Sequence, residues 1–539
     1  MFRNILLAAW ITAAASVTNV SISQEFGVDD KRCFRANGTR PCKSISFALG
    51  ILNDVAFYKE TLFILSIRDK YHALLSQVNI SQPRVDRLVF LTSADDSSTT
   101  VISSGSEFSG LIIGTQTGST THNIHVSNIE FQQFSASLAA VVLMWNSNNI
   151  TFTNCVFEDN ERSGINAFDS GVTVEGCVFS NNTANAHQTC QFSPGVTSVA
   201  GGAGFVYENA NGLNLIVRKT NFTGNSAAVN DTDKVVIPAS GSFVSVLNYL
   251  GGGLLISFHG KAKSNKALVK NSVFAKNNAT MGGGLYLAVD DIDSTQNDTG
   301  NQIEIQGTSF ESNYASQVGG GLRIYMWDAS FRTKIKDCVF RSNSAVTGGG
   351  IDVYVEKNSR HLLTYLQFNN VTWDGNNGRD GAAIHFASGP LKEYAGAITV
   401  IPEFIDCTIQ NHYASYYTFT SPFTSQGVSV KFMGTNVFCK NHGAGAMWHL
   451  GGVLHVSGTL RFTKNSGSVG GAVLLSSSQI SLYAGSELSF LQNHAIWKGG
   501  AIAVFNPASY EFITEYNPYC FVIYNEERTK PSKWKVRAR

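Results

Sequence analysis

The sequence has 539 residues, of which 15% are charged, and its formal net charge is +1. A balance this even excludes a nucleic-acid or polyanion binder that works through net charge alone. The sequence is rich in glycine (50 residues) and phenylalanine (35 residues), and both recur in fixed phrases along the chain.

Residues 1–15 are predicted to be a secretory signal peptide. Arg3 precedes the apolar run Ile5–Ile11, and the small residues Ala13–Ala15 come before an expected cut after Ala15. A membrane anchor is the alternative, but the apolar run is shorter than the ~20 residues that a span needs. Because no later segment is long and apolar enough to cross a bilayer, the sequence predicts a secreted, extracellular protein with no transmembrane segment beyond the signal peptide.

Residues 16–86 are predicted to form an N-terminal cap region with a short helix. The segment Pro41–Leu52 has Ile45, Leu49 and Leu52 at helical spacing. Such an amphipathic helix could close the first coil of a repetitive fold, whose core and strand edges would otherwise be exposed.

Two phrases recur from the middle of the chain to its end. The first reads Phe-x-x-Asn, with Trp once in place of Phe, and its asparagines are Asn160, Asn182, Asn225, Asn277, Asn313, Asn343, Asn376, Asn441, Asn465 and Asn493. The second is a pair of glycines followed by small or aliphatic residues, and it begins at Gly201, Gly251, Gly282, Gly319, Gly348, Gly451, Gly470 and Gly499. A phrase that returns every few tens of residues is typical of a solenoid.

The repeating unit is predicted to be a coil of short β-strands. Apolar and polar residues alternate in Ile150–Phe157 and Val172–Phe179, and the phenylalanines that end these segments are 22 residues apart. Stacked coils place each residue ~4.8 Å above its counterpart. Phenylalanine rings would then stack inside, asparagine amides would form a ladder of hydrogen bonds, and glycines would form the tight corners.

These paired phrases resemble the repeats of the polymorphic outer membrane protein family. The resemblance covers Asn123–Val504 and implies an all-β fold, a right-handed parallel β-helix, which we place at residues 87–505. Two repeats depart from the pattern: His412 stands where asparagine is expected, and Gly381-Ala382-Ala383 lacks the second glycine.

Residues 506–539 are expected to form a C-terminal tail. In animal members of the family, a segment similar to Tyr516–Tyr524, with a later tryptophan (here Trp534), is usually followed by further coils. The resemblance therefore implies that the chain is a shortened piece of a larger protein.

Asn-x-Ser/Thr sequons agree with export and predict N-glycosylation. The candidate acceptors are Asn37, Asn79, Asn149, Asn181, Asn221, Asn230, Asn278, Asn297 and Asn370. Chance is the alternative, because a chain rich in Asn, Ser and Thr produces sequons freely.

The nine cysteines give one expected disulfide and one candidate. Cys33 and Cys42 flank a short loop and are expected to pair in an oxidising compartment. Cys155 and Cys177 occupy the same place in adjacent coils, where a disulfide and two buried thiols are both compatible with the spacing. The sequence does not pair the remaining cysteines, which are Cys190, Cys338, Cys407, Cys439 and Cys520.

No catalytic residue, metal site or cofactor is predicted. Parallel β-helices host polysaccharide lyases and hydrolases, whose sites need acids and bases stacked on one face. The acidic run of Asp290, Asp291 and Asp293 matches no calcium motif and is interpreted as a solvated loop. Asp328 and Asp352 follow glycine phrases at different offsets, whereas His385 and His455 occupy comparable places.

The predicted function is therefore a secreted, non-enzymatic adhesion or binding module of a cell surface or extracellular matrix. Its ligand would be an extracellular glycan or protein, not a nucleic acid. A polysaccharide lyase or glycoside hydrolase on the same fold is the alternative. The contact surface is expected in the insertions between repeats, which are Gln188–Ala200, Val229–Leu250, Asp290–Asn301, Ala387–Ile401 and Thr418–Gln426.

Overall fold

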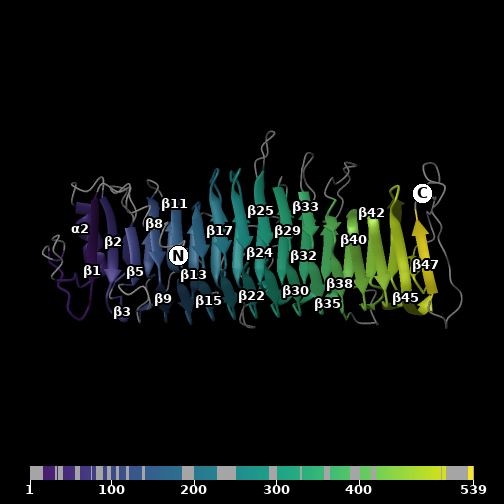
Figure 1. Cartoon of the computed structure of the whole chain (residues 1–539), viewed down its shortest axis with the longest axis horizontal. Coiled ribbons are helices and arrows are strands. Elements are labelled where there is room, and N and C mark those ends of the chain that lie inside the picture. The colour runs from purple at the N-terminus through teal and green to yellow at the C-terminus, as the bar shows by residue number, and fades with distance from the viewer. Residues whose placement is uncertain are drawn as a thin grey trace, which may run out of the picture. The chain divides into compact units, whose positions relative to one another are not determined.

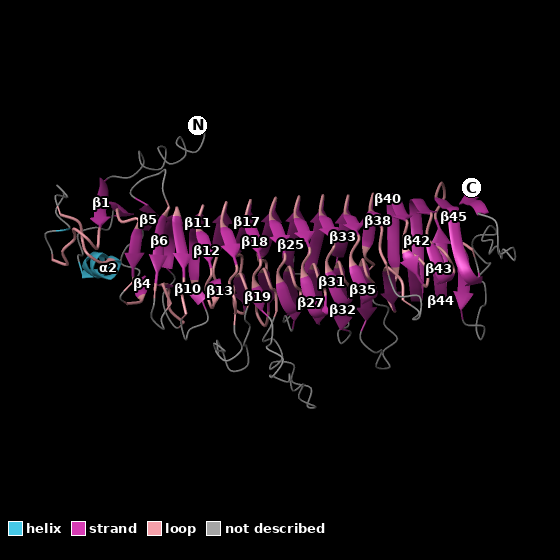
Figure 2. Cartoon of the chain, turned by 90° about the horizontal axis from the view of Figure 1, so that it is seen from below, coloured by secondary structure: helices cyan, strands magenta, loops and turns pink. Residues whose placement is uncertain are grey.

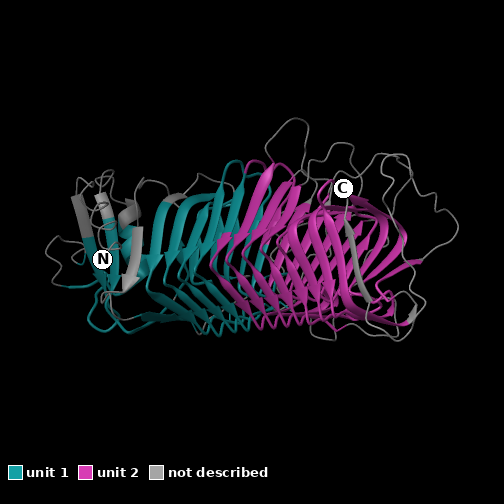
Figure 3. Ribbon diagram, turned by 45° about the vertical axis from the view of Figure 1, so that its right-hand side comes forward, with its two compact units in different colours: residues 1–255, 265–268 teal, residues 256–264, 269–539 magenta. Residues whose placement is uncertain are grey.

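The structure is a computed structural model of the whole chain. It describes residues 16–30, 33, 40–54, 61–74, 76–80, 89–93, 99–104, 109–116, 121–135, 140–184, 200–227, 250–290, 300–327, 331–356, 365–388, 401–413, 420–498, 500–505 and 532–537. The chain divides into two compact units, coloured separately in Figure 3. Unit 1 contains Met1–Leu255 with Asn265–Leu268, and unit 2 contains Ile256–Ser264 with Val269–Arg539.

The predicted fold class, an all-β right-handed parallel β-helix, is confirmed. Within each unit, strands from successive coils lie side by side in parallel (Figure 1). In the regular coils, three or four short strands alternate with turns.

The first face of the coil follows the glycine corner, and we call it the corner sheet. Its strands are β4 (Val78–Ile80), β7 (Leu111–Ile113), β10 (Ala140–Trp145), β13 (Ser163–Phe168), β16 (Ala203–Tyr207), β20 (Leu254–Phe258), β24 (Leu285–Asp290), β28 (Leu322–Trp327), β32 (Ile351–Glu356), β36 (Ile384–Ser388), β39 (Phe423–Gln426), the start of β42 (Met447–Thr463), the start of β44 (Val473–Leu482) and β46 (Ile502–Phe505).

The second face, which we call the long sheet, begins at the first strand of unit 1. Its strands are β1 (Ser16–Ile22), β2 (Thr61–Ile67), β5 (Val89–Ser93), β8 (Thr121–Ser127), β11 (Ser147–Thr153), β14 (Val172–Glu175), β17 (Asn214–Arg218), β21 (Lys266–Lys270), β25 (Asn301–Gln306), β29 (Phe331–Lys336), β33 (Tyr365–Asn369), β37 (Glu403–Ile405), the start of β40 (Val430–Cys439), the middle of β42 and the end of β44.

The third face carries the Phe-x-x-Asn phrases. Its strands are β3 (Tyr71–Ala73), β6 (Thr100–Ser103), β9 (Ile129–Gln132), β12 (Val156–Glu158), β15 (Val178–Ser180), β18 (Asn221–Thr223), β22 (Val273–Ala275), β26 (Ser309–Glu311), β30 (Val339–Arg341), β34 (Thr372–Asp374), β38 (Thr408–Gln410), the ends of β40 and β42, and β45 (Glu487–Lys498). Shorter strands then lead back to the glycine corner, and these are β19 (Ser226–Ala227), β23 (Asn278–Met281), β27 (Tyr314–Val318), β31 (Ser344–Thr347), β35 (Asn377–Asp380), β41 (His442–Gly443) and β43 (Ser466–Val469).

Stacked phenylalanine rings fill the interior beside the third face. In unit 1, Phe157 stacks on Phe179 with ring centroids 4.7 Å apart and ring planes 6° apart. In unit 2, Phe310 stacks on Phe340 at 4.5 Å and 2°. All four rings are fully buried. The recurring phenylalanine therefore contributes buried apolar area and a ring contact in the coils that carry it.

The ten asparagines of the repeated phrases are all buried. Asn343 shows the pattern of contacts. Its Nδ2 donates to Oδ1 of Asn376 at 2.9 Å and to the backbone oxygen of Phe310 at 2.8 Å. Its backbone N–H donates to the same Oδ1 at 2.9 Å. Each such amide satisfies polar groups that the turn would otherwise leave buried without partners.

The glycine corner depends on the absence of a side chain. Gly319 has a φ of +68°, which glycine adopts without strain. A Cβ on Gly320 would collide with the backbone oxygens of Ser344 and Gly349 in the next coil. The backbone at the corner of one coil therefore packs directly against the backbone at the corner of the next coil.

The phrase that begins at Gly451 was predicted to be such a corner, and this prediction is wrong. Met447 and Val473 stand in register on the corner sheet, whereas Leu454 pairs with Val430 and Ile480 on the long sheet. Gly451 and Gly452 both have positive φ and lie where β42 passes from one sheet to the next. The segment from Ala444 to Ala446 occupies the corner instead, with small residues whose sequence does not match the phrase.

A short helix lies at the N-terminal end of unit 1, as expected. Helix α2 (Ile45–Asp54) buries Ile45 and Leu49 and lies next to β4 (Figure 2). Ser44 begins it as an N-cap, because its Oγ accepts the backbone N–H of Phe47 at 3.2 Å. Asp29 in turn accepts the backbone N–H of Ser44 at 2.9 Å.

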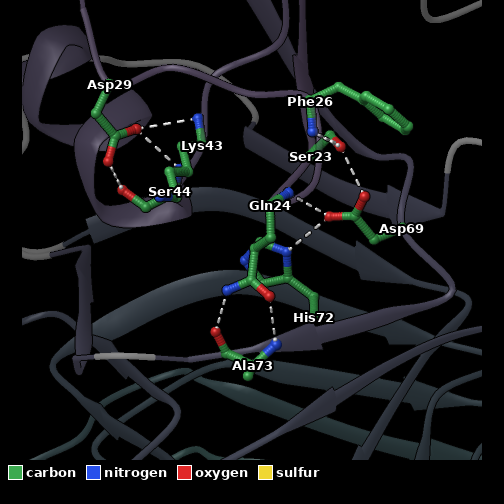
Figure 4. A network of polar contacts seen from close by, with 9 residues as sticks. All are labelled: Ser23, Gln24, Phe26, Asp29, Lys43, Ser44, Asp69, His72 and Ala73. Atoms are coloured by element: carbon green, nitrogen blue, oxygen red, sulfur yellow. Dashed lines mark hydrogen bonds and ion pairs between the residues drawn. The ribbon is translucent and has the colours of Figure 1, made fainter.

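A second polar network ties the chain after β1 to the loop before β3 (Figure 4). Asp69 accepts the Oγ–H of Ser23 at 2.7 Å and the backbone N–H of Gln24 at 2.5 Å. Gln24 also forms two hydrogen bonds with the backbone of Ala73, one of them at 2.9 Å. Strand β1 also pairs in parallel with β2, so parallel strand pairing already occurs within residues 16–86.

Of the C-terminal tail, the structure describes β47 (Ser532–Arg537). This strand pairs antiparallel with β45, so that Trp534 lies opposite Phe490 and Arg537 opposite Glu487. An antiparallel strand does not continue the parallel stack, and it covers one strand edge of the coil that contains β45.

Replacing Asn343 with leucine should destabilise the protein by about 1–3 kcal/mol, because two backbone groups and one amide oxygen lose their buried partner. Asn369 provides a matched control, since it points outward from β33 and is only half-buried. Denaturant unfolding of Asn343→Leu and Asn369→Leu measures the difference. Equal stability of the two variants would contradict a structural role for the ladder.

His412 interrupts the ladder between Asn376 and Asn441. It is fully buried, its Nδ1 lies 3.2 Å from the backbone oxygen of Asn376, and its Nε2 has no partner among the described residues. Burial lowers the pKa of this imidazole to about 4 from an ordinary value of 6.5. The folded protein therefore holds it neutral, and stability from this residue is lost as the pH falls from 6.5 towards 4.

His412→Asn should complete the ladder and raise the free energy of unfolding by about 1 kcal/mol at neutral pH. The gain should be larger at pH 5, where the wild-type protein must exclude a proton that its unfolded state binds. Denaturant unfolding at both pH values checks this, with the exposed His494→Asn as control. A variant that is less stable than wild type at both pH values would count against the ladder account.

Candidate functional site

The long sheet of unit 2 presents an outward surface of polar and aromatic side chains, which we call the polar face. It consists of Gln302, Glu304, Gln306, Arg332, Lys334, Lys336, Tyr365, Gln367, Glu403, Lys431, His455 and Tyr483. Strand alternation produces it: Ile303 and Ile305 of β25 are buried, while the residues between and beside them point outward.

One row of the polar face crosses six successive strands in register. From β25 to β42 it reads Glu304, Lys334, Gln367, Glu403, Lys431 and His455. Because the coils stack in parallel, each coil contributes one side chain at intervals of ~4.8 Å. The row is therefore a regular line of donors and acceptors along unit 2.

Hydrogen bonds hold the centre of this row in place. Glu403 accepts the hydroxyl of Tyr365 at 3.2 Å, the Nε2 amide of Gln367 at 3.2 Å and the ammonium of Lys431 at 3.3 Å. The Gln367 amide also donates to the Tyr365 hydroxyl. Partial burial and the charge of Glu403 raise the pKa of Tyr365, which keeps its hydroxyl protonated.

Two aromatic rings belong to the polar face, Tyr365 within this network and Tyr483 beside His455. Tyr365 is 41% exposed and Tyr483 is 47% exposed, so both rings are open to solvent. The Tyr483 hydroxyl lies 3.4 Å from Nδ1 of His455. Burial and the nearby Lys431 lower the pKa of His455, which favours its neutral form. An exposed aromatic ring can stack on the apolar face of a ligand's ring, while the polar side chains beside it bind the ligand's hydroxyl groups.

The corner sheet of unit 2 holds a second constellation, the buried cluster of Arg323, Asp352 and His385. These residues occupy the same register position on β28, β32 and β36. The guanidinium of Arg323 forms an ion pair with Oδ2 of Asp352, and Nδ1 of His385 lies 2.6 Å from Oδ1. All three residues are at most 9% exposed.

The electrostatics of the buried cluster favour a neutral histidine. Burial lowers the pKa of His385 to about 4, and the charge of Arg323 adds to this while that of Asp380 opposes it. Burial also lowers the pKa of Arg323, against the raising effect of Tyr286, Tyr325 and Tyr354.

The sequence reasoning missed this cluster because it compared the wrong positions. Arg323, Asp352 and His385 each stand two residues after the end of a glycine phrase, if Gly381-Ala382-Ala383 is counted as one. That equal offset was the available signal. The expectation that His385 and His455 are comparable is wrong, since His385 pairs with Thr424 on the corner sheet and His455 with Lys431 on the long sheet.

Cys33 and Cys42 form the expected disulfide, with Cα atoms 5.0 Å apart. The second candidate bond is absent: Cys155 and Cys177 are buried free thiols. Each sulfur points to a backbone oxygen of the preceding coil, at 3.5 Å for Cys155 and 3.6 Å for Cys177. In-register stacking keeps the two side chains parallel, whereas a disulfide requires them to converge. Cys338, Cys407 and Cys439 are also free.

Most of the predicted glycosylation sites within the described residues are exposed, some in strands and two, Asn181 and Asn370, in bends between strands. Asn79, Asn149, Asn181, Asn221 and Asn370 are exposed, and Asn278 is half-buried in β23. Asn37, Asn230 and Asn297 lie outside the described residues. Three of these asparagines use the side-chain amide as a hydrogen-bond donor to a side-chain oxygen in a neighbouring coil. They are Asn149, Asn181 and Asn370, and the distances are 2.6–3.1 Å.

The insertions expected to form the contact surface lie largely outside the described residues, as do Asp291 and Asp293. Asp290 ends β24. One insertion was misplaced, because Phe423–Gln426 forms the regular strand β39.

Over the part of the chain that is described, no group of three His, Cys, Asp or Glu residues could hold a metal ion. The described residues include no helix that could span a membrane.

A family model described as a right-handed beta helix region matches residues 65–248, which supports a β-helix repeat family. The structure is similar to PfbA, a surface adhesin of Streptococcus pneumoniae, at 12% identity and a TM-score of 0.35, covering 90% of this chain and 93% of the adhesin. It is also similar to tailspike protein 3 of bacteriophage CBA120, at 9% identity and a TM-score of 0.31, covering 87% of this chain and 61% of the tailspike. No curated protein matches the sequence.

Alkylation of the native, non-reduced protein should modify Cys439 before the other four described free cysteines. Cys439 is partly accessible, whereas burial raises the pKa of Cys338 and Cys407 to about 12 and leaves little thiolate to react. Peptide mass spectrometry after a time course measures the order, and the denatured protein provides the control. Loss of both Cys155 and Cys177 into a linked peptide would contradict their assignment as free thiols.

Proposed function

We propose that this protein is a secreted, non-enzymatic binding module of a cell surface or extracellular matrix. Its ligand is an extended, uncharged glycan that lies along the polar face of unit 2. The observation that carries the proposal is the in-register row from Glu304 to His455 with the open rings of Tyr365 and Tyr483 beside it.

The spacing of the row suits a polymer of sugars. Coils repeat at ~4.8 Å, close to the length of one pyranose unit in an extended chain. One coil could therefore contact one sugar, with hydroxyl groups bound by the amide of Gln367 and the carboxylate of Glu403. The rings of Tyr365 and Tyr483 would stack against the apolar faces of sugars at separate positions.

The charges on the polar face favour an uncharged glycan. Glu403 is paired with Lys431 at 3.3 Å, and Glu304 stands opposite Lys334. Lys336 lies 3.7 Å from Asp337. Arg332 is then the one cation of the polar face with no acidic neighbour in these pairs, so long-range attraction of a polyanion is weak.

Two further features support an exported protein of this kind. The apolar N-terminal run and the exposed sequons agree with secretion and glycosylation. The buried asparagine ladder and the glycine corners account for the recurring phrases, which agrees with a repeat of the polymorphic outer membrane protein type.

A polysaccharide lyase or hydrolase is the second candidate, and the buried cluster is the observation in its favour. The cluster is poorly suited to proton transfer at neutral pH. Asp352 is already paired with Arg323 and His385, and the pKa of His385 near 4 makes it a weak base. The binding module is therefore the better supported function.

Screening purified protein on an array of neutral and acidic glycans should identify a neutral oligosaccharide that binds. Tyr365→Ala should weaken its affinity at least ~10-fold, which corresponds to about 1.4 kcal/mol. Raising the salt concentration should leave that affinity unchanged, because the charges of the face are paired. Isothermal titration calorimetry measures both effects.

Tyr314→Ala is the matched control, since Tyr314 is 50% exposed but lies on β27, away from the polar face. Equal losses in the two variants, or binding of acidic glycans only, would refute the proposed ligand. Release of new reducing or unsaturated sugar ends would favour the enzyme instead.

A further inference from the structure

Two successive coils of unit 2 each bury a histidine, and we call them the histidine coils. The first is formed by β37, β38 and β39 and contains His412, and the second is formed by β40, β41 and the start of β42 and contains His449. Both side chains are fully buried. Nε2 of His412 and both ring nitrogens of His449 have no hydrogen-bond partner among the described residues. A proton added to either ring would therefore meet no acceptor there.

The fold does not require a histidine at either place. The ladder position of His412 is taken by asparagine in the coils on both sides. The position of His449 is taken by Ser425 in the preceding coil and by Leu475 in the following one. Residues that do not titrate near neutral pH therefore satisfy the repeat at both places, and the two imidazoles are local departures from it.

The first histidine coil also lacks the other two features of the repeat. Ile409 takes the place of the stacked ring, in register with Trp373 and Phe438. Pro422 stands at the corner, where its oxygen accepts N–H groups of the preceding coil but its nitrogen has no hydrogen to donate to the next. Fewer of the repeated contacts therefore hold this coil to its neighbours than hold the coils of β28 and β32.

Burial keeps both imidazoles neutral, because it lowers the pKa of each to about 4 from an ordinary value of 6.5. At His412 the charge of Asp374 opposes this effect, but Asp374 also lies 3.6 Å from Arg341. At His449 the charge of His455 adds to it. The unfolded chain binds protons at these positions near pH 6.5, whereas the folded coils exclude them until about pH 4. Stability is therefore lost as the pH falls between those two values.

We propose that His412 and His449 form an acid-sensitive switch, in which uptake of a proton by each imidazole opens the two histidine coils while the coils of β25 to β32 stay folded. In a solenoid each coil contacts only its neighbours, so a loss of stability in two coils can remain local. His385 is buried in the preceding coil, but its Nδ1 lies 2.6 Å from the carboxylate of Asp352. That carboxylate is a counter-charge of the kind that the two switch residues lack.

Opening of the histidine coils would dismantle one end of the polar face. Glu403 lies on β37, Lys431 on β40 and His455 on β42. Acid would then release a ligand held by this row. Release rests on the proposed function, whereas opening does not and is measured without ligand. A protein that opens in acid but binds no glycan at pH 7 would refute the proposed function and leave the switch intact.

The experiment is hydrogen–deuterium exchange of the full chain at pH 7, 6 and 5, read by mass spectrometry and corrected for the intrinsic exchange rate at each pH. With two pKa values that fall from 6.5 to about 4 on folding, protection of peptides from the histidine coils should drop about 500-fold between pH 7 and pH 5. Peptides from β25 and β28 are the internal control and should keep their protection. Unchanged protection in the histidine coils, or an equal loss throughout unit 2, would overturn the proposal.

Variants assign the effect to the two residues. His412→Asn with His449→Leu introduces the residues of neighbouring coils and should remove the pH dependence. Each single variant should retain a change of roughly 20-fold, as expected for one proton. The exposed His494→Asn should behave as wild type. His385→Gln should keep the pH dependence of the histidine coils, and its loss in this variant, or its persistence in the double variant, would overturn the assignment to His412 and His449.

Discussion

The hydrogen bond from one ladder asparagine to the next is the interaction on which the rest of the structure depends. The amide of each such residue donates to the amide oxygen of the next ladder asparagine and to the backbone oxygen of a phenylalanine in the preceding coil, as in Asn313 and Asn343. The ladder reinforces the register that backbone pairing sets between coils, and register decides which side chains share a row. Both the polar face and the buried cluster exist because residues tens of positions apart in sequence are held at equivalent places.

The two constellations solve opposite problems. On the polar face, charges remain near water, where pairs such as Glu403 with Lys431 add little stability but keep side chains in fixed positions. In the buried cluster, Asp352 and its partners are removed from water, where a charge is tolerated only with compensation. The first arrangement suits the long ligand proposed above, which would be bound by many weak contacts.

Departures from the repeat show which residue substitutions the β-helix tolerates. His412 replaces a ladder asparagine and remains neutral inside the core. Cys155 and Cys177 are small buried side chains without a disulfide, because parallel stacking points both sulfurs in the same direction and not toward each other. Backbone pairing between coils continues through these positions, which explains why single irregular residues do not interrupt the fold.

The sequence alone indicated the coil, the ladder, the short helix and the disulfide of Cys33 with Cys42, because each appears in the sequence as a short recurring phrase or as residue types at short spacing. It placed Gly451 at a corner and overlooked Arg323, Asp352 and His385 as a group. A glycine pair fits any bend, so only the pairing of Leu454 with Val430 shows which bend it forms. Acids and bases from coils about 30 residues apart become neighbours only when every insertion between them is assigned to a turn. That assignment is made by backbone hydrogen bonds between coils, which the tertiary structure shows and the order of residues does not.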